Sequence, residues 1–191
     1  MKRESLKRIL VICIYTLLIV SCQHKSKWQM EEEKFEIKQQ ATIDKLEADN
    51  TNQRVINQIV YLGTDSLQSV YLKDFVCSPK LFLYFSSNTC SPCIEQTVEI
   101  IEKNFPNYKE NESIVFISPD YPKRFRINCY GKKLLNLEEG KLGLPLENGE
   151  QPPFLFVLDK NMRINKIHIV NKMDFIRTER YLIELKKTLL R

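Results

Sequence analysis

The hydrophobic and polar positions divide the chain into three regions of different character. Residues 9–20 form a mainly apolar run that follows a basic start. From residue 23 to about 59 there is no glycine or proline, and Glu, Lys and Gln are frequent, a pattern that favours a helix. Further along, short apolar runs alternate with amphipathic segments. We therefore predict a leader at residues 1–21, a polar helical tether at 22–62 and a folded domain at 63–191.

The strands of the folded domain are predicted from their apolar runs. Residues 80–86 and 114–118 are almost continuously apolar, which is typical of buried central strands. Residues 69–75 are expected to form an edge strand or one arm of a hairpin. Residues 154–158 and 163–170 are predicted to pair as a second hairpin across a short polar turn.

Two amphipathic helices complete this pattern. One is predicted over residues 91–105, with its apolar side chains on one face and Pro106 just beyond its end. The other is predicted to begin after Asp174, a residue suited to cap it. A basic stretch before the second hairpin is expected to be loosely helical. This alternation indicates an α/β fold with a central mixed sheet in a three-layer sandwich, preceded by the helical tether.

Charge and composition narrow the functions to be considered. The 191 residues carry a formal charge of +5, but residues 1–21 account for +3 of it, so nucleic-acid binding is not expected. None of the five glycines falls in a dinucleotide or phosphate-loop motif. The two histidines, His24 and His168, are far apart in the sequence. We therefore expect no cofactor and no metal.

The N-terminus is predicted to be an export signal. Residues 2–8 are basic, and the apolar run after them is too short to span a membrane but suits a signal peptide. The sequence Ile19-Val20-Ser21-Cys22 resembles the lipobox of bacterial lipoproteins. The resemblance implies cleavage before Cys22, lipid on its sulfur and a cell-envelope location. A plain signal peptide and an uncleaved anchor are the alternatives.

The tether at residues 22–62 has opposite charges at helical spacings. Its apolar heptad positions are interrupted by polar ones, so a stable coiled coil is not expected. As a helix it would hold the folded domain roughly 50 Å from the lipid. A partly disordered linker is the alternative interpretation.

The candidate chemistry lies at Cys90-Ser91-Pro92-Cys93, where a predicted buried strand meets a predicted helix. The first N–H groups of a helix stabilise a thiolate, so Cys90 is expected to be the attacking nucleophile. Cys93, one turn further on, is expected to be more sheltered and to resolve the mixed disulfide. A structural disulfide or half of a zinc site would use the same spacing. The chain has no second C-x-x-C, which disfavours zinc.

With this motif the chain resembles the membrane-anchored bacterial thioredoxin-like proteins of the TlpA (redoxin) type, in the thioredoxin superfamily. The resemblance covers about residues 66–190 and rests on K-L-F-L-Y-F-S-S-N-T-C-S-P-C, S-I-V-F-I-S and P-P-F-L-F-V-L-D-K-N-M-R-I. It implies thiol–disulfide exchange with Cys90 and Cys93. It also implies a cis-proline beside the cysteines, at Pro153, and a substrate-binding backbone at Pro152.

Three positions depart from the thioredoxin pattern. The tryptophan before the first cysteine is replaced by Thr89. The buried aspartate six residues before that cysteine is replaced by Tyr84, a poor base at neutral pH. Pro152 has no N–H to donate to a bound peptide. We expect these changes to affect catalytic power more than the fold.

The remaining cysteines and the second histidine are expected to have no role in the chemistry. Cys77 and Cys129 are expected to be unpaired and buried, with a second disulfide as the alternative. His168 alternates with apolar neighbours in a predicted strand and is expected to point outward to solvent.

The sequence thus favours a lipid-anchored thiol-disulfide oxidoreductase of the bacterial envelope, with reduction mildly favoured. Its expected partners are envelope proteins with thiols or disulfides and a membrane redox partner. A non-catalytic interaction module that keeps a structural disulfide is the main alternative. A peroxiredoxin is disfavoured, because its motif requires proline where Leu83 stands.

Overall fold

The computed structural model describes residues 27–63, 68–138, 140–148 and 152–189. Contacts divide the chain into two compact units, Met1–Ile43 and Asp44–Arg191, and the sheet belongs to the second. The predicted leader and the predicted lipid-bearing Cys22 lie outside the described residues. Within the described part of the chain, no helix is both long enough and apolar enough to cross a membrane.

The first described element is helix α2, Lys27–Asn50, which is shorter than the predicted one. The side chains of Asn50 and Thr51 bond back to carbonyl oxygens four residues earlier, and Asn52 adopts a positive φ of 64°. This combination ends the helix. The residues that follow lead into the sheet, which lies within the unit Asp44–Arg191.

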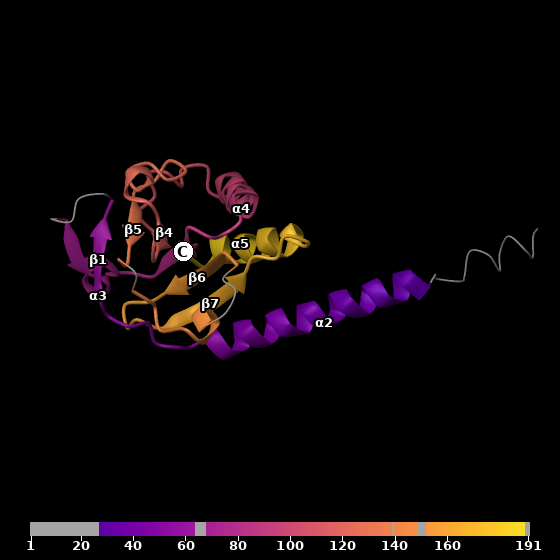
Figure 1. The fold of residues 1–191 in the computed structure, drawn as a ribbon. Coiled ribbons are helices and arrows are strands. Elements are labelled where there is room, and N and C mark those ends of the chain that lie inside the picture. The colour runs from indigo at the N-terminus through magenta and orange to yellow at the C-terminus, as the bar shows by residue number, and fades with distance from the viewer. Residues whose placement is uncertain (1–26, 64–67, 139, 149–151, 190–191) are drawn as a thin grey trace, which may run out of the picture. The chain divides into compact units, whose positions relative to one another are not determined.

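A seven-stranded mixed sheet with the order β2-β1-β5-β4-β3-β6-β7 forms the centre of the second unit (Figure 1). Strands β3, β4 and β5 are parallel, and all other neighbouring pairs are antiparallel. This architecture confirms the predicted α/β fold with a central mixed sheet. The strands are β1 Ile59–Leu62, β2 Ser69–Tyr71, β3 Lys80–Tyr84, β4 Ile114–Ser118, β5 Leu134–Asn136, β6 Phe154–Leu158 and β7 Ile164–Ile169.

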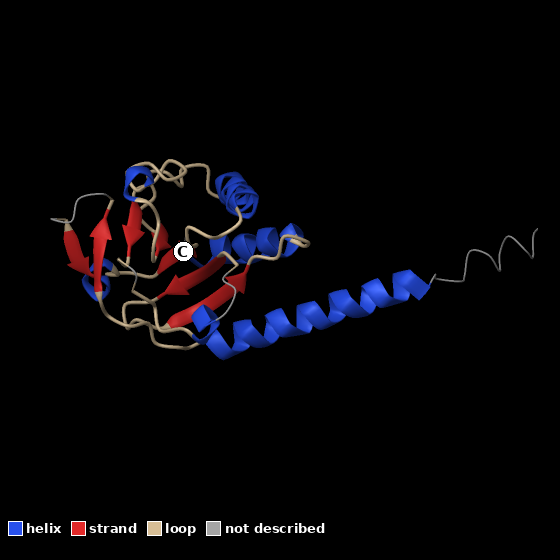
Figure 2. Ribbon diagram, in the orientation of Figure 1, coloured by secondary structure: helices blue, strands red, loops and turns tan. Residues whose placement is uncertain are grey.

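The two long helices of this unit, α4 (Ser91–Asn104) and α5 (Phe175–Leu189), contribute to one hydrophobic core on one face of the sheet (Figure 2). Alternate residues of the β3 segment, Leu81, Leu83 and Phe85, belong to this core, as period-two alternation requires. The core also contains Ile94, Val98, Ile101 and Phe105 of the predicted helical stripe. Both predicted helices are therefore confirmed.

The opposite face of the sheet carries stacked aromatic rings. Phe82 stacks on Phe156 with ring centroids 5.0 Å apart, and Tyr84 stacks on Phe154 at 4.5 Å. Tyr84 also forms a hydrogen bond with Glu147, so the turn that carries Glu147 covers this face at the end of β3. The short helices of the unit are α3 Leu72–Phe75, η1 Lys123–Phe125 and η2 Pro145–Asn148.

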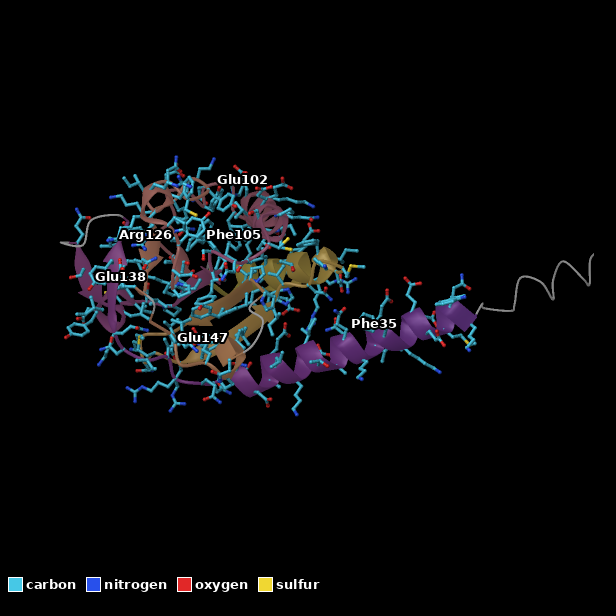
Figure 3. The ribbon with its side chains drawn as sticks, in the orientation of Figure 1. Phe35, Glu102, Phe105, Arg126, Glu138 and Glu147 are labelled. Atoms are coloured by element: carbon cyan, nitrogen blue, oxygen red, sulfur yellow. The ribbon has the colours of Figure 1, made fainter. Side chains whose placement is uncertain are left out.

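The basic stretch after β4 forms only the single turn η1, and it leads into the unpredicted strand β5. Arg126 of this stretch is buried, with Nε donating to the carbonyl oxygen of Tyr121 at 2.6 Å. Its Nη1 donates to Oε1 of Glu138 at 2.8 Å (Figure 3). This stretch is therefore not a uniformly solvated charged face.

His168 corrects the sequence-based expectation, because it is buried and not turned toward solvent. Its Nε2 lies 2.9 Å from Oγ1 of Thr178, and its Nδ1 lies 3.2 Å from Oε1 of Glu47. The imidazole also stacks on Tyr181. Alternation predicts an outward side chain only where one face of a strand is solvated, and the second half of β7, residues 167–169, is buried on both faces.

Candidate active site

The cysteine pair lies where the loop after strand β3 enters helix α4, with Cys93 in the first turn of the helix. Cys90 is the N-cap residue of α4, and its carbonyl oxygen accepts hydrogen bonds from the N–H groups of Cys93 (3.0 Å) and Ile94 (3.2 Å). Pro92 fits the first turn, where N–H groups have no helical partner. Cys90 is exposed, whereas only 8% of Cys93 is exposed.

The two thiols are electrostatically different. The Cys93 S–H and then the Cys93 backbone N–H donate to the Cys90 sulfur and lower the pKa of Cys90 below its usual range. The ammonium of Lys172 acts in the same direction, and Glu95 opposes it. Burial, together with donation to Cys90, raises the pKa of Cys93 to about 11. The arrangement therefore favours a thiolate at the exposed sulfur and a protonated thiol at the sheltered one.

The loop that leads into Cys90 is held by two sets of hydrogen bonds. Oγ1 of Thr89 accepts the N–H of Ser86 at 2.9 Å, closing a tight turn. The N–H and hydroxyl of Ser87 both donate to the carboxylate of Asp120, each at 2.8 Å. Thr89 thus contributes a backbone contact at the position where a thioredoxin has tryptophan. Asp120, which the sequence analysis did not identify, ties this loop to the end of β4.

The proline pair lies at the same end of the sheet as the cysteines. Tyr84, the last residue of β3, pairs with Phe154, the first residue of β6. The expectation of a cis bond before Pro153 is wrong, since the described residues contain no cis peptide bond. A trans bond is the ordinary preference of an X–Pro pair. The carbonyl oxygen of Pro153 accepts the N–H of Val170 at 2.9 Å, so this strand end is already occupied by β-type pairing.

No family model matches the chain, and no curated protein matches it. Among solved structures, a cysteine-to-serine mutant of PrxQ from Xylella fastidiosa is similar, with a TM-score of 0.52 at 11% identity over 72% of this chain and 96% of that one. A thiol:disulfide interchange protein from Bacteroides sp. gives a TM-score of 0.45 at 18% identity over 74% and 91%. An exposed lipoprotein thioredoxin from Streptococcus pneumoniae gives 0.45 at 17% over 68% and 99%.

The chain has a thioredoxin-like fold. The PrxQ similarity and the strand order establish the fold alone.

Tyr84 occupies the place of the thioredoxin aspartate, and the structure gives it a partner that the sequence did not reveal. Its hydroxyl forms a hydrogen bond with the carboxylate of Glu147, which is itself buried. The Glu147 oxygens also accept the N–H groups of Leu142 and Leu144, both at 2.9 Å. Burial first, and then Glu147, raises the pKa of Tyr84 beyond its usual range. Tyr84 is therefore a donor to a buried carboxylate and not a base.

The other described cysteines of the thioredoxin-like domain are not paired with each other. Cys77 and Cys129 are both free, as expected. Cys129 is buried beside Tyr121, and burial raises its pKa to about 11. Cys77 is exposed, contrary to the expectation, because it follows the short helix α3 at the surface. Within the described ranges, no three His, Cys, Asp or Glu side chains gather in a way that could hold a metal ion.

Proposed function

We propose that this protein is a thiol-disulfide oxidoreductase of the bacterial envelope, of the membrane-anchored TlpA type, and that Cys90 and Cys93 carry the reaction. The observation that supports this function is the asymmetry of the cysteine pair. An exposed sulfur with a lowered pKa stands at a helix N-terminus, beside a sheltered thiol with a raised pKa. A purely structural disulfide requires neither the exposure nor the difference in pKa.

Reduction is the direction mildly favoured, because no histidine stands between the two cysteines, whereas strongly oxidising relatives often have one. In this direction, the Cys90 thiolate attacks one sulfur of a substrate disulfide. The substrate S–S bond breaks, a Cys90–substrate disulfide forms, and the departing substrate thiolate takes a proton from solvent.

The second step closes the cysteine pair. Cys93 loses its proton and attacks the Cys90 sulfur. A Cys90–Cys93 disulfide forms, and the second substrate thiolate is released and protonated. Two electrons pass from the cysteine pair to the substrate, and a dithiol redox partner at the membrane would return them.

Trapping tests this function. In Cys93→Ser the second step cannot occur, so mixed disulfides between Cys90 and envelope proteins should accumulate in cells. Cys90→Ser is the matched control and should trap none. Recovery of no partner with Cys93→Ser would favour the alternative, a non-catalytic interaction module with a structural disulfide. A reduction potential of the wild-type pair within about −120 to −270 mV supports exchange, whereas one below about −300 mV supports the module.

The envelope location rests on the sequence before the described residues. We propose that Cys22 is lipidated after cleavage of residues 1–21 and that helix α2 separates the lipid from the thioredoxin-like domain. Cys22→Ser should abolish lipid labelling and leave the protein unprocessed or released from the membrane. Cys13→Ser is the control and should change neither. Unchanged labelling in Cys22→Ser would refute the anchor.

A further inference from the structure

The segment that joins β7 to α5 carries Lys172, whose charge acts on the Cys90 sulfur. Tyr84 at the end of β3 pairs with Phe154 at the start of β6, and Phe154 pairs with Ile169 at the end of β7. The chain that leaves β3 toward Cys90 and the chain that leaves β7 therefore emerge at one end of the sheet. Residues 171–176, which join β7 to α5, consequently border the active site.

This segment has a defined backbone. The N–H of Met173 donates to Oδ1 of Asn171 at 3.0 Å, and the N–H of Asp174 donates to the Asn171 carbonyl oxygen at 3.0 Å. Oδ1 of Asp174 accepts the N–H of Arg177 at 3.1 Å, in the manner of a helix cap. The backbone of this segment is thus held in place before any partner binds.

Three of these side chains are exposed. Lys172 is exposed, and the exposed fractions of Met173 and Ile176 are 71% and 64%. Within the described residues, Lys172 forms no ion pair with a carboxylate. Met173 lies in the turn just before α5, and Ile176 is the second residue of that helix. A lysine beside an apolar pair is thus available for contact with a partner.

The effects of nearby charges on the pKa of Cys90 agree with a position of Lys172 beside the active site. The Lys172 ammonium is close enough to lower the pKa of Cys90, and the Glu95 carboxylate is close enough to raise it. Burial, then Cys129 and then Glu95 raise the pKa of Tyr130. The Glu95 carboxylate therefore also acts on Tyr130. The field around the attacking sulfur is therefore polarised between Lys172 and Glu95.

We propose that Lys172, Met173 and Ile176 form a docking surface that selects protein substrates with an acidic side chain next to the reacting cysteine and an apolar side chain beyond it. This inference rests on the proposed exchange activity and names its substrate class. The carboxylate of the substrate pairs with Lys172, and the apolar side chain covers the flexible Met173 and Ile176. Glu95 repels the same carboxylate, so it also sets the direction in which the substrate lies across Cys90.

The test uses two peptides that differ at one position. Each contains one cysteine, blocked as a mixed disulfide with a chromophoric aromatic thiol, and either Glu or Lys stands next to that cysteine. Reduced wild-type protein should release the chromophore about fivefold faster from the Glu peptide at low salt. The ratio should fall toward one at high ionic strength. Because Lys172 also affects the pKa of Cys90, the measured quantity is the ratio of rates, in which that effect cancels.

Substitutions of Lys172 test whether its charge causes the preference for the Glu peptide. Lys172→Met should bring the ratio to one or slightly below it, because Glu95 still repels the Glu peptide, and Lys172→Glu should invert the ratio. Lys160→Glu is the matched control, because Lys160 is exposed and lies in the turn between β6 and β7, at the opposite end of the sheet. It makes the same change in net charge and should leave the ratio unchanged. A wild-type ratio that persists in Lys172→Glu overturns the docking surface, as does an equal effect of Lys160→Glu.

The apolar part is tested in the same assay. A Glu peptide with Leu beyond the acidic residue should react about threefold faster than one with Ser there. Ile176→Ser should remove that advantage. Equal rates for the Leu and Ser peptides with wild-type protein would overturn the apolar contact.

The outcomes of these assays distinguish the docking surface from the proposed exchange function. If reduced wild-type protein attacks neither peptide, the exchange function fails, whereas equal rapid attack on the Glu and Lys peptides refutes only the docking surface.

Discussion

The buried pair of Tyr84 and Glu147 leads to a quantitative prediction about stability. Tyr84→Phe removes one hydroxyl oxygen and leaves the aromatic stack on Phe154 in place. Glu147 then keeps the two N–H donors from Leu142 and Leu144 but loses its phenolic donor. Because only 1% of Tyr84 and 2% of Glu147 are exposed, water cannot easily replace that donor.

The chain supplies a matched comparison at Tyr108. This residue is also buried, and its hydroxyl donates to the carbonyl oxygen of Tyr130 at 2.8 Å. The same Tyr→Phe change there removes a bond to a neutral acceptor, whereas at Tyr84 it removes a bond to a carboxylate. Hydrogen bonds to charged groups contribute about 1.5–3 kcal/mol, and neutral ones about 0.5–1.5 kcal/mol. Tyr84→Phe should therefore lower the free energy of unfolding by more than Tyr108→Phe.

Urea denaturation followed by far-UV circular dichroism measures both variants, with the slope of the transition checked for constancy. A double-mutant cycle of Tyr84→Phe with Glu147→Gln should give a coupling energy of about 1–3 kcal/mol. Two results would refute the reasoning. One is a cost of Tyr84→Phe no larger than that of Tyr108→Phe, and the other is a coupling energy near zero.

Three further predictions follow from other contacts. Cys93→Ala removes the S–H donor to Cys90, so the pKa of Cys90 should rise and the pH profile for its alkylation should move to higher pH. An unmoved profile would contradict the assigned hydrogen bond. Burial raises the pKa of Cys93, so release of substrate from the Cys90 mixed disulfide should accelerate by up to about tenfold per pH unit from neutral toward alkaline pH, and a flat profile would point to an internal base. Glu47→Ala leaves the Ile169 N–H, His168 and Arg177 without their shared acceptor. It should lower the free energy of unfolding by about 2–4 kcal/mol and speed hydrogen exchange at residues 44–50, whereas Glu36→Ala at an exposed site should do neither.

Local patterns were sufficient to predict the elements that carry the cysteines. The apolar run that contains Leu81 and Leu83 was correctly predicted as a buried strand, because a strand covered on both faces needs apolar side chains throughout. The helix after Cys90 followed from apolar positions three and four apart and from Pro92 in its first turn. The exposure of Cys90 and the shelter of Cys93 could also be predicted, because Cys90 lies at the open end of the helix and Cys93 lies one turn further in, next to the apolar Ile94.

The contacts that tune the site join residues far apart in the chain, and only the tertiary structure decided them. Glu147 reaches Tyr84 across 63 positions, and Glu47 reaches His168 across 121. No local periodicity encodes such pairs, because they depend on which strands become neighbours and on which loop covers each face. The trans bond before Pro153 has the same origin, since the surroundings of an X–Pro bond, and not its sequence, select between isomers that differ by only about 0.5–1 kcal/mol.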